Sequence, residues 1–157
     1  MQEGEDMIFE RLKELRNYEG YTQKDVASIL NVQRATYAGW ESGKDIMPLT
    51  QLLKIANNYQ KSLDYITGLS NNDEKYISGK GNIDIQVVAN NIHKYRKSNN
   101  ITQKKMAQDL KTTQSNIHKY ETGKCLITTM YALEFAKHYN YPLDDLIGRT
   151  VKKKPKN

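Results

Sequence analysis

The chain has 157 residues, of which 38% are hydrophobic and 27% are charged, and its formal net charge is +6. This composition is typical of one or two ordinary globular domains. The net positive charge favours an anionic binding partner. The single cysteine, Cys125, excludes an internal disulfide and suits a reducing cytoplasm, and no apolar run approaches the roughly 18 residues of a membrane helix. The acidic start MQEGEDM is unlike the basic start of a signal peptide.

The sequence repeats itself at an offset of 80 residues without a gap. TQKDVASIL at 22–30 pairs with TQKKMAQDL at 102–110, ESGK at 41–44 pairs with ETGK at 121–124, and LDYITG at 63–68 pairs with LDDLIG at 143–148. Because the register holds from about residue 8 to residue 149, we expect two copies of one structural unit.

In the first copy, the apolar spacing is helical throughout. It predicts a first helix that Asp6 caps, a second from the N-cap Thr22 to about Leu30, and a third that Gly43 closes. The third helix is expected at residues 33–42 and the fifth at 63–67. The fourth is expected to contain Leu52, Leu53, Ala56 and Tyr59.

The second copy predicts the same five helices. Asp84 and Thr102 are the expected N-caps of its first two helices, and Gly123 closes the third. The third helix is expected at residues 113–122 and the fifth at 143–147. The fourth is expected to contain Leu133, Ala136 and Tyr139. Since no period-two segment competes, the fold class is all-α, two tandem five-helix domains.

Composition sets the expected boundaries. The first domain covers residues 1–69 and the second covers 84–149, and the polar, glycine-containing stretch 70–83 between them reads as a flexible linker. Four lysines around a proline make residues 150–157 an expected basic, disordered tail.

The runs TQKKMAQDLKTTQSNIHKYETGK and TQKDVASILNVQRATYAGWESGK resemble the helix-turn-helix of phage repressor and Cro-type transcription regulators, the XRE-like family. The resemblance covers residues 8–69 and 88–149 and includes a small residue, Ala27 or Ala107, where the third helix must cross the second. It implies a repressor-like five-helix fold whose third helix enters the major groove of DNA. Two departures are Asn31 and Lys111, which replace the usual turn glycine.

The outward side chains of the third helices suit base edges. In the second copy, Ile117 faces inward and polar residues face outward, and a glutamine can make paired hydrogen bonds to adenine. By resemblance, the base readers are Thr113, Gln114, Ser115 and Lys119 in the second copy and Gln33, Arg34 and Ala35 in the first. Gly39, which corresponds to Lys119, offers no side chain.

The resemblance also assigns supporting residues. Those expected to contact DNA phosphates are Gln23, Ser42, Lys44, Gln103, Thr122 and Lys124. Two internal ion pairs are expected, Arg16 with Glu41 and Arg96 with Glu121.

These observations predict a sequence-specific regulator of transcription that binds double-stranded DNA, a repressor whose two heads read two half-sites. Residues 1–70 carry eight Lys and Arg against ten Asp and Glu, whereas residues 87–157 carry fourteen against five, so the second head is expected to supply most of the affinity. In the alternative hypothesis, the first domain is a protein-interaction or dimerisation module of antitoxin or anti-repressor type, and only the second binds DNA.

An enzyme is not expected. The histidines His93, His118 and His138 have no metal-ligand spacing, and the chain has no glycine loop that could cradle a phosphate. We expect no cofactor, metal, small-molecule ligand or membrane partner, and a cytoplasmic location; a homodimer stays open.

Overall fold

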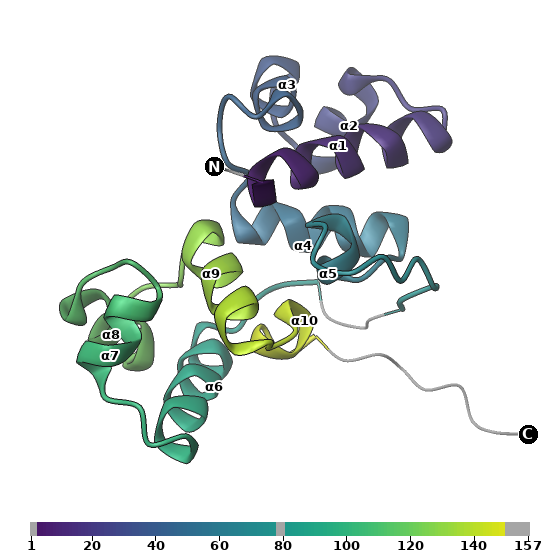
Figure 1. Cartoon of the computed structure of the whole chain (residues 1–157). Helices are drawn as coiled ribbons and strands as arrows, with labels where there is room; N and C mark the ends of the chain where they lie inside the picture. Colours follow the sequence, from purple (N-terminus) through teal and green to yellow (C-terminus); the bar gives the residue numbers. More distant parts are fainter. Residues whose placement is uncertain (1–2, 78–80, 150–157) are drawn as a thin grey trace, which may run out of the picture. The chain divides into compact units, whose positions relative to one another are not determined.

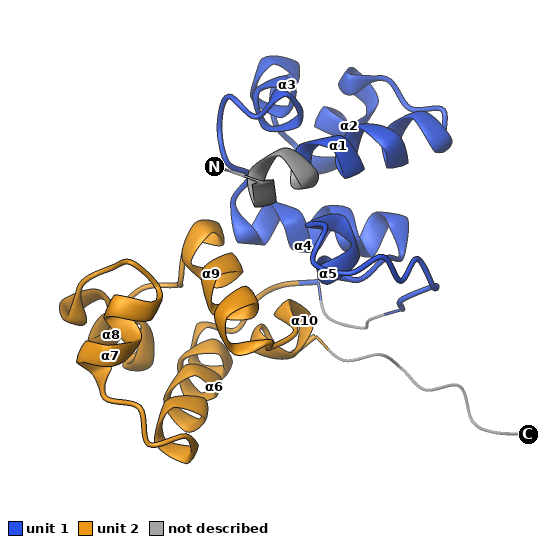
Figure 2. Cartoon of the chain, viewed as in Figure 1, with its two compact units in different colours: residues 1–81 blue, residues 82–157 orange. Residues whose placement is uncertain are grey.

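The computed structural model describes residues 3–77 and 81–149, with side chains described from Phe9 onward in the first helix. The chain divides into two compact units, residues 1–81 and 82–157 (Figure 2). All regular secondary structure among the described residues is α-helical, which confirms the predicted fold class. The predicted tail at 150–157 lies outside the described residues.

Each unit contains five helices within its described part (Figure 1). Those of the first unit are α1 (Glu3–Tyr18), α2 (Gln23–Leu30), α3 (Arg34–Ser42), α4 (Leu49–Tyr59) and α5 (Leu63–Ile66). Those of the second unit are α6 (Ile85–Ser98), α7 (Gln103–Asp109), α8 (Gln114–Glu121), α9 (Thr129–Tyr139) and α10 (Leu143–Leu146).

Local chemistry sets the helix ends. The Thr22 hydroxyl accepts the Asp25 amide and the Asp25 carboxylate accepts the Thr22 amide, which is a capping box at the start of α2. Thr102 and Asp84 likewise accept amides at the starts of α7 and α6. At the end of α3, Gly43 has φ of 83°, a left-handed conformation that costs glycine nothing.

The predicted cap of the first helix is wrong. α1 begins at Glu3, so Asp6 lies inside the helix rather than before it. Acidic residues stabilise the positive end of a helix dipole anywhere in the first turn, and the sequence offers three of them there, so composition alone did not identify the starting residue.

The helices of each unit enclose an apolar core. In the first unit it includes Phe9, Leu12, Val26, Leu30, Tyr37, Leu52, Leu53, Ile55 and Leu63. In the second it includes Val88, Ile92, Met106, Leu110, Ile117, Leu133, Phe135 and Leu143. Full burial of one such side chain stabilises a fold by roughly 1.5 to 3 kcal/mol.

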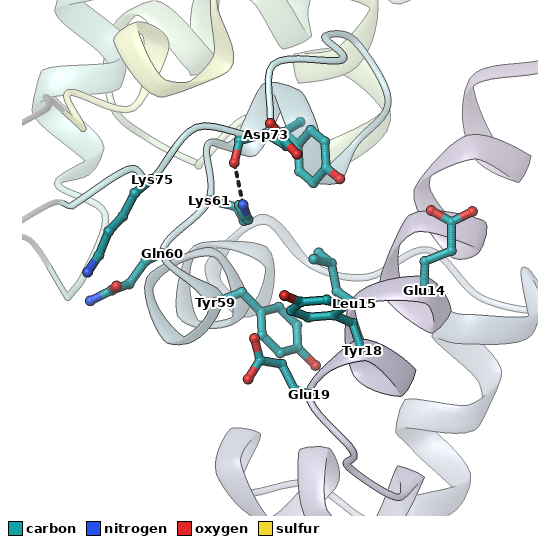
Figure 3. Close-up of a pocket in the computed structure, with 10 residues that line it drawn as sticks. Glu14, Leu15, Tyr18, Glu19, Tyr59, Gln60, Lys61, Asp73 and Lys75 are labelled. Carbon is teal, nitrogen blue, oxygen red and sulfur yellow. Dashed lines mark hydrogen bonds between the residues drawn. The ribbon is translucent and has the colours of Figure 1, made fainter.

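The two cores differ beside the last turn of the fourth helix. In the second unit, the rings of Tyr95 and Phe135 lie 5.5 Å apart and both pack against Tyr139 and Tyr141. The repeat places Leu15 and Lys61 where Tyr95 and Tyr141 stand. The first unit has an open cavity of about 580 Å³ at its surface there, whose lining includes Leu15, Tyr59 and Lys61 (Figure 3).

Part of the expected linker is attached to the first unit. The Tyr76 amide donates to the Gln60 carbonyl at 2.7 Å, and the Ser70 amide donates to the Asp64 carbonyl at 3.0 Å. The backbone amides of these two residues are therefore hydrogen-bonded to the C-cap residue of α4 and to α5.

No helix within residues 3–77 and 81–149 combines the length and the apolar character needed to cross a membrane.

Candidate nucleic-acid interface

The same tight turn joins the second and third helices of both units. Asn31 and Lys111, the residues in the glycine position of the turn, have φ of 54° and 59°. In each turn the following amide donates to the carbonyl of the buried alanine, Val32 to Ala27 and Thr112 to Ala107, both at 2.9 Å. The small alanine side chain lets the two helices approach closely, so the third helix is held rigidly against the second.

α8 presents a polar outer face and an apolar inner face. Ile117 and Tyr120 are buried. Thr113, Gln114, Ser115, His118 and Lys119 are exposed. The five outward residues are thus free of the core, as a base-reading surface requires. Thr113 lies just before α8 as its N-cap, where its hydroxyl accepts the Asn116 amide at 3.2 Å.

α3 presents a smaller surface. Gln33, Arg34 and Ala35 are exposed, with Gln33 as the N-cap residue, whereas Tyr37 and Trp40 pack inward. Gly39 is buried although it stands in the register position of the exposed Lys119. The loop after α3, which includes Asp45, covers this glycine.

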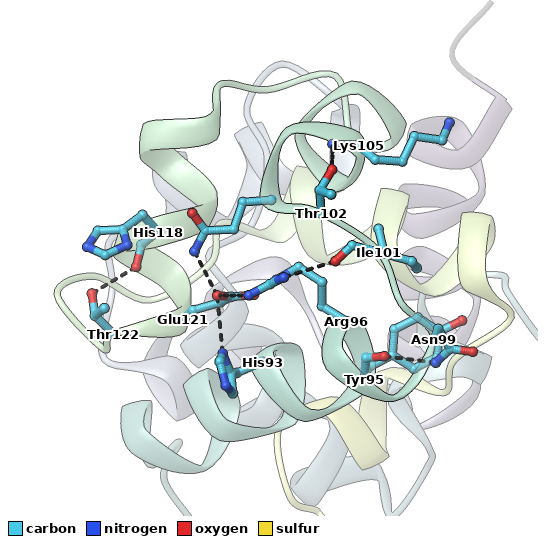
Figure 4. Close-up of polar contacts among 11 residues, drawn as sticks. His93, Tyr95, Arg96, Asn99, Ile101, Thr102, Lys105, His118, Glu121 and Thr122 are labelled. Atoms are coloured by element: carbon cyan, nitrogen blue, oxygen red, sulfur yellow. Dashed lines mark hydrogen bonds and ion pairs between the residues drawn. The ribbon is translucent and has the colours of Figure 1, made fainter.

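Both expected ion pairs are present and link the first helix of each unit to the third. The Arg16 guanidinium donates to both Glu41 oxygens, at 2.7 and 2.8 Å, and to the Tyr21 carbonyl at 2.9 Å. Arg96 donates to both Glu121 oxygens in the same way and to the Ile101 carbonyl at 2.9 Å (Figure 4). Each pair therefore fixes the orientation of the third helix against its domain.

Glu121 has two further partners. The Gln103 amide donates to its Oε2 at 2.9 Å, and His93 Nδ1 lies 3.3 Å from the same oxygen. Burial raises the pKa of Glu121, but hydrogen bonds from Arg96, Gln103 and His93 outweigh burial and hold its pKa below the ordinary value. The pKa of Glu41 is likewise held below its ordinary value: burial raises it, and Arg16 is the main group that lowers it.

His93 is a member of this network that the sequence did not identify. In the repeat it corresponds to Lys13, so neither duplication nor spacing marked it. Its neighbour Glu121 is 25 residues from Arg96 and 28 from His93 in the chain, and only the packing of α6 against α8 brings the three together.

The residues predicted to contact phosphates differ in whether their donor groups already make hydrogen bonds inside the protein. Gln23 and Gln103 are the first residues of α2 and α7, where free backbone amides attract anions, and Lys44 and Lys124 are exposed beyond the ends of α3 and α8. The Ser42 hydroxyl donates to the Gly39 carbonyl at 3.2 Å, and the Thr122 hydroxyl donates to the His118 carbonyl at 2.8 Å. Since a phosphate oxygen only accepts, either hydroxyl must give up its internal bond to reach one.

The cavity of the first unit is separate from these residues. It is lined partly by Tyr18, Tyr59 and Tyr65, with the carboxylates of Glu14 and Glu19 on α1 (Figure 3). None of the residues predicted to contact DNA lines it. The described residues hold no group of three or more His, Cys, Asp or Glu side chains that could bind a metal ion.

The sequences of both units match known protein families. Residues 12–66 match the family described as helix-turn-helix, and residues 89–150 match the family described as helix-turn-helix domain. The chain belongs to the helix-turn-helix family.

Three curated relatives of this tandem helix-turn-helix chain come from Bacillus subtilis (strain 168). It is 30% identical to the uncharacterized HTH-type transcriptional regulator YobD over 74 residues, and these residues make up 47% of this chain and 66% of the relative. It is 40% identical over 58 residues to the HTH-type transcriptional regulator ImmR, which is 37% of this chain and 46% of the relative. It is 37% identical over 60 residues to the SPbeta prophage-derived uncharacterized HTH-type transcriptional regulator YonR, which is 38% of this chain and 56% of the relative.

The helix-turn-helix chain thus spans between 46% and 66% of the length of these relatives. No solved structure matches it.

Proposed function

We propose that this protein binds specific sequences of double-stranded DNA and represses transcription, with α8 as its main reading helix in the major groove. The observation that carries the proposal is the exposed row of Thr113, Gln114, Ser115 and Lys119 on a helix that an ion pair and a tight turn hold rigid. Side chains of these types match base edges, because an amide pairs with adenine and a lysine pairs with guanine.

Phosphate contacts supply the remaining affinity. Gln103 is already held by Glu121 through one amide hydrogen, and its second amide hydrogen is available for a phosphate beside the start of α7. Lys124, and in the first unit Gln23 and Lys44, complete this set, with Ser42 and Thr122 joining once their hydroxyls turn outward. Such contacts orient the protein on DNA without specifying sequence.

Both units act as reading heads in this proposal. The first unit matches the helix-turn-helix family as the second does, and Arg34, the natural partner of guanine, is exposed at the start of α3. These observations favour DNA binding by the first unit over the protein-interaction hypothesis. Repression follows if the bound protein excludes other proteins from its site, and the relatives are bacterial, so we place the protein in the cytoplasm with its DNA.

Binding of the intact chain to duplexes selected from random DNA tests the proposal. Gln114→Ala and Arg34→Ala should each relax base preference in one half-site, at a cost of about 1 to 3 kcal/mol. Lys124→Ala should weaken binding to all duplexes alike and lower the slope of log affinity against log salt by about 1.

Lys137→Ala, an exposed lysine on α9, is the matched control and should change neither quantity. If the intact chain selects no duplex at low salt, the proposed function is wrong. If Arg34→Ala leaves DNA binding unchanged but alters association between chains, the first unit is an interaction module instead.

A further inference from the structure

The loop after α3 places a carboxylate where the second unit has a base-reading lysine. Gly39 and Lys119 are both the sixth residue of their helices. A Cβ atom built on Gly39 would lie 3.0 Å from the Asp45 Oδ2. The Asp45 carboxylate therefore occupies the space that a side chain at position 39 would take.

The backbone shows why this happens in one unit and not the other. In the second unit, the Lys119 carbonyl accepts the Lys124 amide at 3.0 Å. In the first unit, the Gly39 carbonyl accepts the amide one register position later, that of Asp45, at 3.2 Å. The missing side chain at position 39 lets the loop lie against the helix, and this loop buries Gly39.

The carboxylate is available to a ligand on this face. Asp45 is exposed, and so is Lys44 beside it, whose ammonium offsets the repulsion between the carboxylate and nearby DNA phosphates. Arg34, which is exposed at the start of α3, adds a second positive charge.

We propose that Asp45 is a specificity-determining residue of the first unit, which accepts a hydrogen bond from the N4 amino group of a cytosine at the place where Lys119 meets a guanine in the other half-site. A carboxylate can only accept, and cytosine is the base whose major-groove edge offers a donor and no competing acceptor. The two half-sites then differ at this position, with guanine opposite Lys119 and cytosine opposite Asp45. This inference rests on the proposed function.

Three variants of the intact chain test separately whether the effect needs the Asp45 carboxylate, its position over residue 39, or only its negative charge. Asp45→Asn keeps the position and loses the carboxylate. Gly39→Ala keeps the carboxylate and displaces it, because the added methyl needs the space of Oδ2. Asp73→Asn removes one negative charge from an exposed site that lies neither on α3 nor in the loop after it.

The measurement is competition binding on four duplexes that differ only at the first half-site position facing Asp45, identified from duplexes selected by the wild-type chain. The wild-type chain and Asp73→Asn should prefer cytosine by about tenfold. Gly39→Ala should lose this preference, and Asp45→Asn should shift it toward adenine, which pairs with an amide.

If Asp45→Asn binds all four duplexes more tightly by one common factor with the base order unchanged, the carboxylate acts only by repulsion and the inference is overturned. A chain that selects duplexes through the second unit but shows no Asp45-dependent preference also overturns it and leaves the proposed function standing. A chain that selects no duplex at all overturns both.

Discussion

Glu121 is the residue on which the geometry of the second unit converges. Its side chain is 3% exposed and receives hydrogen bonds from Arg96 on α6 and Gln103 on α7. One carboxylate thus ties α8 to α6 and to α7, the helix that starts at Gln103.

Removal of the carboxylate should be costly, because Arg96 is then left buried without its partner. Glu121→Ala is expected to lower the free energy of unfolding by roughly 3 to 5 kcal/mol, measured by chemical denaturation. Glu134→Ala is the matched control: its side chain is 30% exposed and lies 3.9 Å from Lys111, and a surface pair is worth about 1 kcal/mol or less. Equal losses in the two variants would show that the Arg96 pair does not stabilise the fold.

Acid should remove the same contribution. Because the pKa values of Glu41 and Glu121 are held below their ordinary value of 4.5 in the folded state, both pairs stabilise the fold fully above that pH and lose their contribution as pH falls through the depressed folded values. Denaturation measured between pH 7 and pH 3 should show stability falling below about pH 4.5. Glu121→Gln, which cannot ionise, should show a shallower fall; an identical pH profile would contradict this role of the carboxylate.

At the scale of the element, the turn between α7 and α8 holds a lysine in a left-handed conformation. Lys111 has φ of 59°, which costs a residue with a Cβ about 1 kcal/mol relative to glycine, whereas Asn31 in the other turn tolerates it better. The turn keeps this geometry because the Thr112 amide bonds to Ala107 and because the two helices pack through buried side chains. Tertiary packing thus overrides a local preference.

Lys111→Gly should therefore stabilise the protein, by roughly 0.5 to 1 kcal/mol in thermal or chemical unfolding, since it relieves the strained backbone. Lys94→Gly, at an exposed position in the middle of α6, should instead destabilise it by about 1 kcal/mol. Destabilisation by both substitutions would mean that Lys111 is not strained.

At the scale of the whole molecule, the chain carries two unequal heads on one polypeptide. The proposed reading surface is fuller in the second unit, where Lys and Arg outnumber Asp and Glu, whereas Asp and Glu outnumber Lys and Arg over residues 1–70. The first unit offers Arg34 and the Asp45 loop. Paired half-sites lie about 34 Å apart on one face of DNA. The eight residues from Tyr76 to Asp84 extend to about 28 Å at most.

Covalent linkage should therefore raise affinity for a duplex that carries both half-sites. A protease site inserted between residues 77 and 81 allows one sample to be measured before and after cleavage. Cleavage should weaken binding to the two-half-site duplex by about 100-fold or more, because linkage acts as a high effective concentration, and should leave binding to a single half-site unchanged. Equal affinity before and after cleavage would show that the heads act independently.

Much of the fold could be predicted from the sequence because its signals are local. Thr22, Thr102, Asp84 and Gly43 act within one turn of their own helix ends, and the apolar period within each helix set the buried face. The same helical period predicted which side chains of α8 face outward. Asp6 was misplaced because several acidic residues compete for the same helix start.

The sequence by itself determined the two copies, their all-helical class and the residues at the turns, because spacing and duplication are visible along the chain. The tertiary structure decided what depends on residues far apart in the sequence: His93 and Gln103 on the Glu121 carboxylate, the cavity beside Tyr59, and residues 70–76 bound to the first unit. The position of Asp45 over Gly39 belongs with these. Each of these depends on contacts or space between residues far apart in the sequence, and no periodic pattern along the chain encodes them.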